Sequence, residues 1–128
     1  MKKVILTGAG GFIGRHAVPY LLKKNHEGHA PFVGHKPDIK PHRNLIWHKC
    51  NLLDPAAQEK LCTKVKASHL LHFAWYTVPG KYWISQENLC WVQASLGLII
   101  NFIKNGGIRA VMAGTCAEYD WERGTTCN

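Results

Sequence analysis

Short apolar runs alternate along this chain with segments of helical periodicity. The apolar runs occupy residues 2–6, 29–33, 45–48, 68–73 and 108–113, and their length suits buried strands. Residues 11–24, 54–66 and 82–105 read as helices, and the third carries apolar residues at helical spacing: Leu89, Val92, Leu96, Ile99, Ile100 and Ile103. The predicted order is strand, helix, strand, strand, helix, strand, helix, strand. This order favours a doubly wound α/β fold with about five mostly parallel strands and helices on both faces.

Prolines modify this pattern at three points. Pro19 lies inside the first predicted helix, where an interior proline costs about 3 kcal/mol, so we expect a kink or an open turn there. Pro31 weakens the second strand because it has no N–H for the ladder. Asp54 and Pro55, in contrast, suit the N-cap and the first residue of the second helix.

A glycine-rich turn follows the first strand directly. Gly8, Gly11 and Gly14 have G-x-x-G-x-x-G spacing behind Thr7. The first glycine permits a tight turn, the second lets the backbone approach a pyrophosphate, and the third lets the helix pack near the strand. The N-terminus of the helix offers free N–H groups and a partial positive charge to phosphates. We therefore predict a dinucleotide site here, with a ligand-free glycine turn as the alternative.

The composition indicates one globular domain over residues 1–128. Hydrophobic residues make up 46% of the chain, enough for a core and too many for a disordered segment. No apolar run approaches the roughly 20 residues of a membrane span, and the chain opens on a strand rather than a signal peptide. The five cysteines lack C-x-x-C or zinc-like spacing and predict reduced thiols in the cytoplasm.

The formal net charge of +8 suits an anionic ligand such as a dinucleotide or a nucleotide sugar. A nucleic-acid partner is an alternative, based on Lys36, Lys40, Arg43 and Lys49 near Trp47. We consider nucleic acid unlikely because basic residues are spread over the chain and no nucleic-acid motif occurs.

The eight histidines do not indicate a metal site. His69 and His72 are three apart on a predicted strand and so point to opposite faces. The others mostly lie in or near turns without companion ligands, and we expect histidines that are solvated or at the edge of the core.

Four stretches together resemble the N-terminal part of an extended short-chain dehydrogenase/reductase of the NAD-dependent epimerase/dehydratase type. Residues 7–14 match T-G-x-x-G-F-I-G, 51–54 resemble D-L-x-D, 72–75 resemble H-x-A-[AW], and 113–119 resemble S-S-x-x-x-Y. The resemblance implies a Rossmann-like fold, NAD or NADP as cofactor, and hydride transfer at a sugar carbon of a nucleotide sugar. Epimerisation, dehydration or reduction would follow.

The resemblance also implies the residues of a cofactor site. The pyrophosphate would be held by Gly8, Gly11, Phe12, Ile13 and Gly14. Asp54 would bind the adenine amino group with Leu53 flanking the ring, and a role as helix N-cap alone is the alternative.

The remaining implied residues lie toward the reacting end of the cofactor. Phe73, Ala74 and Trp75 would line the ribose and nicotinamide, although Trp75 is equally consistent with packing. Thr115 would be the catalytic hydroxyl that polarises the substrate, with a strand cap as the alternative. Asn88 resembles a supporting helix asparagine of the family, or else is simply exposed.

Two departures from the family pattern bear on function. The second strand is followed by residues 33–36 with no acid before Asp38, and Lys36 gives a mild lean toward the extra phosphate of NADP. The catalytic Tyr-x-x-x-Lys, expected some two dozen residues beyond Thr115, is not present there. We therefore expect a Rossmann domain truncated before the sixth strand and the substrate-binding part, inactive by itself. A non-catalytic dinucleotide-sensing module is the alternative, and the helix over 82–105 favours a homo-oligomer.

Overall fold

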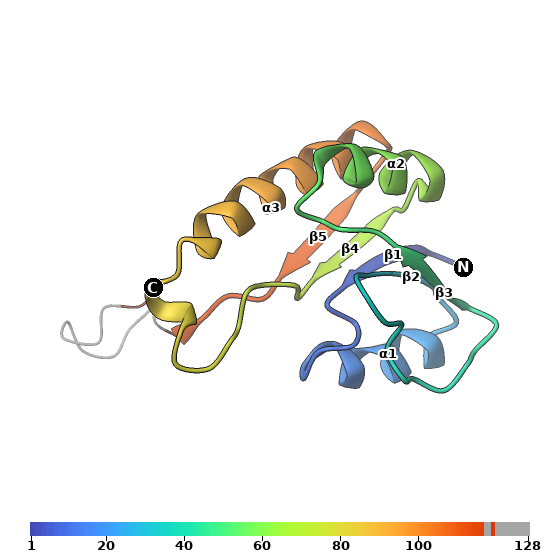
Figure 1. The fold of residues 1–128 in the computed structure, drawn as a ribbon. Coiled ribbons are helices and arrows are strands. Elements are labelled where there is room, and N and C mark those ends of the chain that lie inside the picture. Colours follow the sequence, from blue (N-terminus) through green and yellow to red (C-terminus); the bar gives the residue numbers. More distant parts are fainter. Residues whose placement is uncertain (117–118, 120–128) are drawn as a thin grey trace.

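The protein is described by a computed structural model that covers residues 1–116 and Tyr119. The elements of this part are, in chain order, β1 (Lys3–Thr7), α1 (Gly14–Lys23), β2 (Glu27–Phe32), β3 (Leu45–Lys49), α2 (Pro55–Val65), β4 (His69–His72), the short 3₁₀ helix η1 (Tyr82–Ile84), α3 (Glu87–Lys104) and β5 (Arg109–Met112). Figure 1 shows them along the chain. The predicted order of strands and helices is confirmed.

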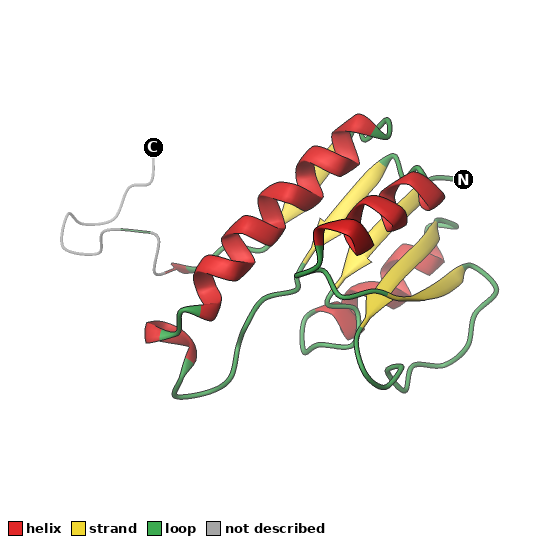
Figure 2. Ribbon diagram, turned by 45° about the horizontal axis from the view of Figure 1, so that its top comes forward, coloured by secondary structure: helices red, strands yellow, loops and turns green. Residues whose placement is uncertain are grey.

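The five strands form one sheet in the order β3-β2-β1-β4-β5, and every pairing is parallel. α1 covers one face of the sheet, and α2 and α3 lie together on the other, as Figures 1 and 2 show. The predicted Rossmann-like doubly wound fold is therefore confirmed. Because all strands run in one direction, the loops after β1, β2, β4 and β5 meet at the same edge of the sheet.

Two cores hold these layers together, and β1 contributes to both. Ile5 faces α2 and α3, while Val4 and Leu6 face α1, as the alternation of side chains along a strand requires. Buried residues complete the cores, including Leu61, Val65, Leu70, Leu98 and Phe102 on one face and Val18, Leu21, Ala30 and Leu45 on the other. Full burial of each large apolar side chain stabilises the fold by about 1.5–3 kcal/mol.

A buried glutamine joins α2 to α3. Gln58 is 2% exposed, and its Nε2 donates to the carbonyl oxygens of Leu52 and of Ala94, the latter at 2.7 Å. A Cβ at Gly97 would lie 2.8 Å from Gln58 Oε1, so glycine lets the two helices approach. The polar bridge fixes the middle of α3 relative to the loop after β3.

Several element boundaries differ from the prediction. α1 begins at Gly14 rather than Gly11, because Gly11 N–H donates back to Gly8 O at 2.9 Å in a turn. α3 begins at Glu87 rather than Tyr82, because Ser85 has extended backbone (ψ 134°) after η1. α1 continues through Pro19 to Lys23, so the proline does not end the helix. β2 contains Pro31 and pairs it with His48.

Candidate cofactor site

The three spaced glycines shape the loop between β1 and α1. Gly8 has φ +66°, and a Cβ there would lie 2.8 Å from the backbone nitrogen of Ala74. A Cβ on Gly14 would lie 2.0 Å from Gly8 O, whereas one on Gly11 would lie 3.2 Å from the same oxygen. The loop therefore closes on itself and against the strand end of β4 only with glycine at 8 and 14. The N-terminus of α1 begins at this loop and places the partial positive charge of the helix dipole beside it.

A buried polar network ties this loop to β4 and α3. Thr7 Oγ1 accepts from the N–H groups of Phe73 and Ala74, each at 3.1 Å, and lies 2.7 Å from His72 Nδ1. With both acceptor positions taken, the Thr7 hydroxyl donates to His72 Nδ1. The proton of the neutral imidazole then resides on Nε2, which donates to Ser95 Oγ at 2.8 Å.

Sequence reasoning missed this network. Thr7, His72 and Ser95 are all at most 5% exposed, and burial lowers the pKa of His72 below its usual value. The expectation of solvated or core-edge histidines is therefore wrong for His72. The one available signal was a threonine ending an apolar strand opposite a strand that ends in histidine.

A small cavity of about 240 Å³ lies beside the glycine loop at the carboxyl ends of the strands. It is lined by Gly8, Ala9, Gly10, Pro31, Phe32, Val33, His35, Pro37, Cys50, Asn51, Leu52, Ala74 and Trp91. Of the predicted cofactor residues, Gly8 and Ala74 belong to it. Leu52 lies in the wall, whereas Leu53 and Asp54 are not among the lining residues. Asp54 Oδ1 instead accepts from Ala56 N–H at 3.0 Å and caps α2.

The segment 33–44 folds back over the glycine loop. A Cβ at Gly10 would lie 2.5 Å from Pro37 Cγ, so Gly10 is needed for this contact. The contact brings His35 into the wall of the small cavity and leaves the neighbouring Lys36 exposed. Lys36 itself is not among the residues that line the cavity, and no acid precedes Asp38 in this segment.

Arg15 adds a second cation that sequence reasoning missed. Its Nη2 donates to Gly10 O at 3.1 Å and its Nε to Gly11 O at 3.3 Å. The guanidinium is thereby held against the glycine loop while the residue stays exposed. Its position directly after Gly14, in the first turn of α1, was the available signal.

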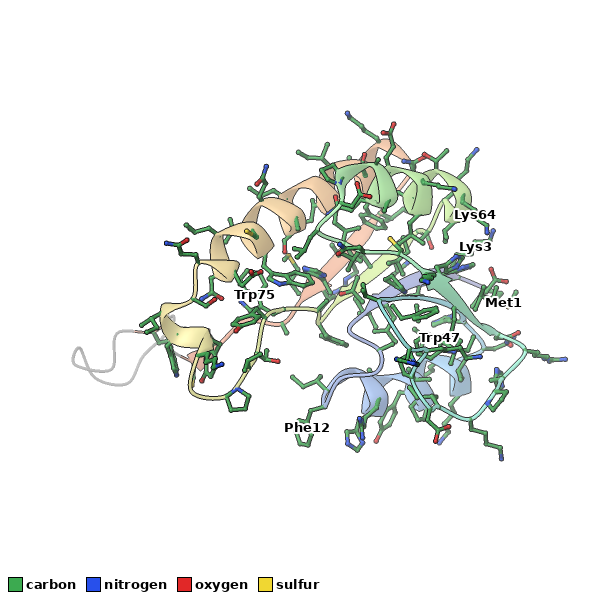
Figure 3. All side chains as sticks on the ribbon, viewed as in Figure 1. Met1, Lys3, Phe12, Trp47, Lys64 and Trp75 are labelled. Atoms are coloured by element: carbon green, nitrogen blue, oxygen red, sulfur yellow. The ribbon has the colours of Figure 1, made fainter. Side chains whose placement is uncertain are left out.

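A larger cavity of about 620 Å³ lies on the other side of Ala74, which lines both. Its walls are Ile13, His72, Phe73, Ala74, Trp75, Tyr76, Thr77, Tyr82, Trp83, Asn88, Met112, Ala113, Gly114 and Thr115. The structure thus brings together Ile13, Phe73, Trp75 and Thr115 of the predicted site. Phe12 is 84% exposed and points away from the body of the protein, as Figure 3 shows.

Asn88 connects the first turn of α3 to the loop after β4. Its Oδ1 accepts from Trp75 Nε1 at 2.8 Å, and its Nδ2 donates to the carbonyl oxygen of Tyr82. Asn88 is therefore not simply an exposed helix residue.

Tyr76 and Tyr82 line the larger cavity together with Thr115, and neither has a lysine four residues further along the chain. Part of the 113–119 stretch, including Glu118, lies outside the described residues. Tyr20 and Lys24 do have Tyr-x-x-x-Lys spacing, but they lie at the far end of α1 from the glycine loop, at the opposite edge of the sheet.

The described part of the chain holds neither a cluster of metal ligands nor a membrane-spanning helix. No group of three or more His, Cys, Asp or Glu side chains is arranged there to hold a metal ion. None of the helices in that part has the length and apolar character needed to cross a bilayer.

Comparison with known proteins identifies the family. The model of the NAD dependent epimerase/dehydratase family matches residues 4–127. A dTDP-D-glucose 4,6-dehydratase of Dictyostelium discoideum is 28% identical in an alignment of 86 residues, and the match covers 60% of this chain and 20% of the dehydratase.

Solved structures of the same kind share the fold. The epimerase Mth375 of Methanothermobacter thermautotrophicus superposes with a TM-score of 0.81 at 17% identity, over 94% of this chain and 37% of its own. The Bordetella bronchiseptica enzyme WbmG, in complex with NAD and UDP, gives a TM-score of 0.70 at 22% identity, over 88% of this chain and 36% of its own.

The chain spans 20% of the dehydratase and 36–37% of these two enzymes. At such identities the solved structures show a common fold, while the family match extends over residues 4–127 of the 128. The chain belongs to the NAD-dependent epimerase/dehydratase family.

Proposed function

We propose that this chain is the dinucleotide-binding part of an NAD(P)-dependent epimerase, dehydratase or reductase that acts on a nucleotide sugar. The observation that carries the proposal is the glycine loop closed against Ala74, with a cavity on each side of that residue. A dinucleotide would cross at Ala74, with its adenosine half in the small cavity and its nicotinamide half in the larger one. WbmG, which shares the fold, was solved with NAD and UDP.

NADP is the cofactor that the rim of the small cavity favours. His35 lies in its wall, Lys36 follows, and the Arg15 guanidinium is held on the adjacent loop. These residues are three potential hydrogen-bond donors to the 2′-phosphate of NADP. No acid lies at the end of β2 to bind the ribose hydroxyl of NAD, so we expect NADP to bind better than NAD.

Thr115 is the residue of this chain that we assign to the reacting end. It lines the larger cavity together with the neutral His72 and with Ala74. Its hydroxyl would polarise a carbonyl or hydroxyl of the sugar. The chemistry also needs a proton donor. Neither tyrosine of this cavity, Tyr76 or Tyr82, has the lysine of the family's Tyr-x-x-x-Lys pair, so we propose that these residues do not turn over substrate by themselves. A dinucleotide-sensing module would bind cofactor equally, and turnover of any nucleotide sugar by this chain would overturn the assignment of inactivity.

Titration with NADPH and NADH, followed by the fluorescence of the reduced nicotinamide, tests the proposal. We expect both to bind, NADPH more tightly. Arg15→Ala and Lys36→Ala should each weaken NADPH binding by about tenfold, equivalent to about 1.4 kcal/mol. Each should weaken NADH binding much less. Lys40→Ala, an exposed lysine of the same segment that is further along the chain from the wall residue His35, is the control.

The two possible failures have different meanings. If neither dinucleotide binds, the proposed function is wrong. If both dinucleotides bind and the variants weaken NADPH and NADH binding equally, the cofactor-binding function stands and the preference for NADP is wrong.

A further inference from the structure

The larger cavity lacks charge in its described walls. None of the residues that line it is Lys, Arg, Asp or Glu, although the whole chain carries sixteen Lys and Arg. We infer that this cavity takes a neutral pyranose ring stacked on Trp75 and discriminates against sugar acids. The inference rests on the proposed function and specifies the class of sugar.

Trp75 supplies the stacking surface. Its side chain is 39% exposed at the cavity, and its ring lies 6.2 Å from that of Trp91 at 35°. Figure 3 shows it beneath the first half of α3. The Nε1–H of Trp75 already donates to Asn88 Oδ1. The indole therefore contacts a ligand through the face of its ring rather than as a hydrogen-bond donor. Such a face suits the C–H groups on one side of a pyranose.

A second aromatic pair lies on the same wall. The rings of Tyr82 and Trp83 are 4.9 Å apart and inclined by 33°. Asn88 bonds both the Trp75 indole and the Tyr82 carbonyl, so one amide sets the spacing between the two aromatic groups. Asn88 is thus a positioning residue for the sugar, and its amide is already engaged by protein groups.

The absence of charge decides between sugar classes. A carboxylate that entered this cavity would lose water and find no cation in the described wall, which is strongly unfavourable. Burial also keeps His72 neutral, as its lowered pKa indicates. Neutral hydroxyls, by contrast, meet hydroxyl-bearing residues of the wall at Tyr76 and Thr77.

Simple glycosides test the inference without a nucleotide. We would saturate the chain with NADPH and follow its tryptophan indole N–H signals by ¹⁵N NMR. The probes are methyl β-D-glucopyranoside and methyl β-D-glucopyranosiduronate. We expect the glucoside to bind in the millimolar range and shift the Trp75 signal, and the uronate to bind about tenfold more weakly.

Variants separate stacking, positioning and charge. Trp75→Ala should weaken glucoside binding by about fivefold or more. The control is Trp47→Phe, which should not weaken it, because Trp47 of β3 packs on the α1 side of the sheet. Asn88→Leu should weaken glucoside binding and move the Trp75 signal. Asn88→Asp keeps the acceptor for Trp75 Nε1 but loses the donor to the Tyr82 carbonyl, so it should preserve the Trp75 signal and still weaken glucoside binding. Thr77→Arg should strengthen uronate binding relative to glucoside binding, because the arginine supplies a cation for the carboxylate.

Each outcome has a definite meaning. Uronate affinity equal to or above that of the glucoside overturns the inference, as does NADPH binding with no glucoside binding. An unchanged glucoside affinity in Trp75→Ala overturns the role of Trp75. A chain that does not bind NADPH contradicts the proposed function, and this inference falls with it.

Discussion

At the scale of single residues, the Thr7 hydroxyl has the widest consequences. It satisfies two backbone N–H groups of the loop after β4 and determines which His72 nitrogen carries the proton. Residues 65 positions apart in sequence are thereby joined directly behind the glycine loop. Each member is buried, so removal of one would leave a polar partner unsatisfied at a cost of about 1–3 kcal/mol.

The buried His72 predicts how stability depends on pH. Its pKa in the folded protein is lowered from 6.5 by burial, so near and below pH 6.5 the unfolded chain binds a proton that the folded chain does not. The free energy of unfolding should therefore fall as the pH drops below 6.5, by at most about 1.4 kcal/mol per pH unit for this group. The loss should level off below the pKa of the folded state.

Urea unfolding between pH 7.5 and 4.5 checks this expectation. His48 and His69 also have lowered pKa values, so they too make the free energy of unfolding fall as the pH drops. The slope of this free energy against pH in each variant is therefore compared with the slope in the wild type. His72→Gln should have a shallower pH dependence than the wild type, whereas His16→Gln, at an exposed position, should not. An unchanged slope in His72→Gln would contradict the assignment.

At the scale of secondary structure, the sequence located the elements well and their ends less well. Asp54 and Pro55 begin α2 as predicted, because capping depends on neighbours within two residues. The start of α3 was missed because the apolar spacing continues through Trp83 while the backbone is interrupted at Ser85. Periodicity alone does not reveal such a break.

The start of α2 allows the two roles of Asp54 to be separated. Asp54→Ser keeps a side-chain oxygen for the Ala56 N–H, so its free energy of unfolding should stay within about 0.5 kcal/mol of the wild type, while Asp54→Ala should lose about 1 kcal/mol. If the carboxylate also binds adenine, both variants should bind NADPH at least several-fold more weakly. Wild-type affinity in a stable Asp54→Ser would leave the cap as the role of this residue.

At the scale of the whole molecule, apolar surface lies on the outer side of α3 and around β5. The exposed residues are Leu89, Val92, Leu96, Ile100, Ile103, Ile108, Val111 and Met112. All four residues of β5 are exposed, at one edge of the sheet. Contiguous apolar surface of this kind favours association.

We therefore predict that the chain self-associates at micromolar concentration through the exposed stripe of α3. Leu96→Glu combined with Ile100→Glu should shift the equilibrium toward monomer, since both charges would be buried in such an interface. A control with the same added charge, Ala56→Glu with Thr63→Glu at exposed positions of α2 outside this stripe, should not shift it. Sedimentation equilibrium measures the difference, and a monomeric wild-type chain at these concentrations would count against the prediction.

The sequence by itself determined the order of elements, the parallel sheet, the glycine loop and the family, because these depend on short-range spacing and backbone sterics. Only the tertiary structure decided that His72 is buried against Thr7 and Ser95, that Pro37 lies on Gly10, and that Asn88 holds Trp75. It also placed Gly8 in one cavity and Ile13, Phe73, Trp75 and Thr115 in another, with Ala74 lining both. These features join residues distant in sequence, and their contacts follow from how strands and helices pack rather than from any local pattern.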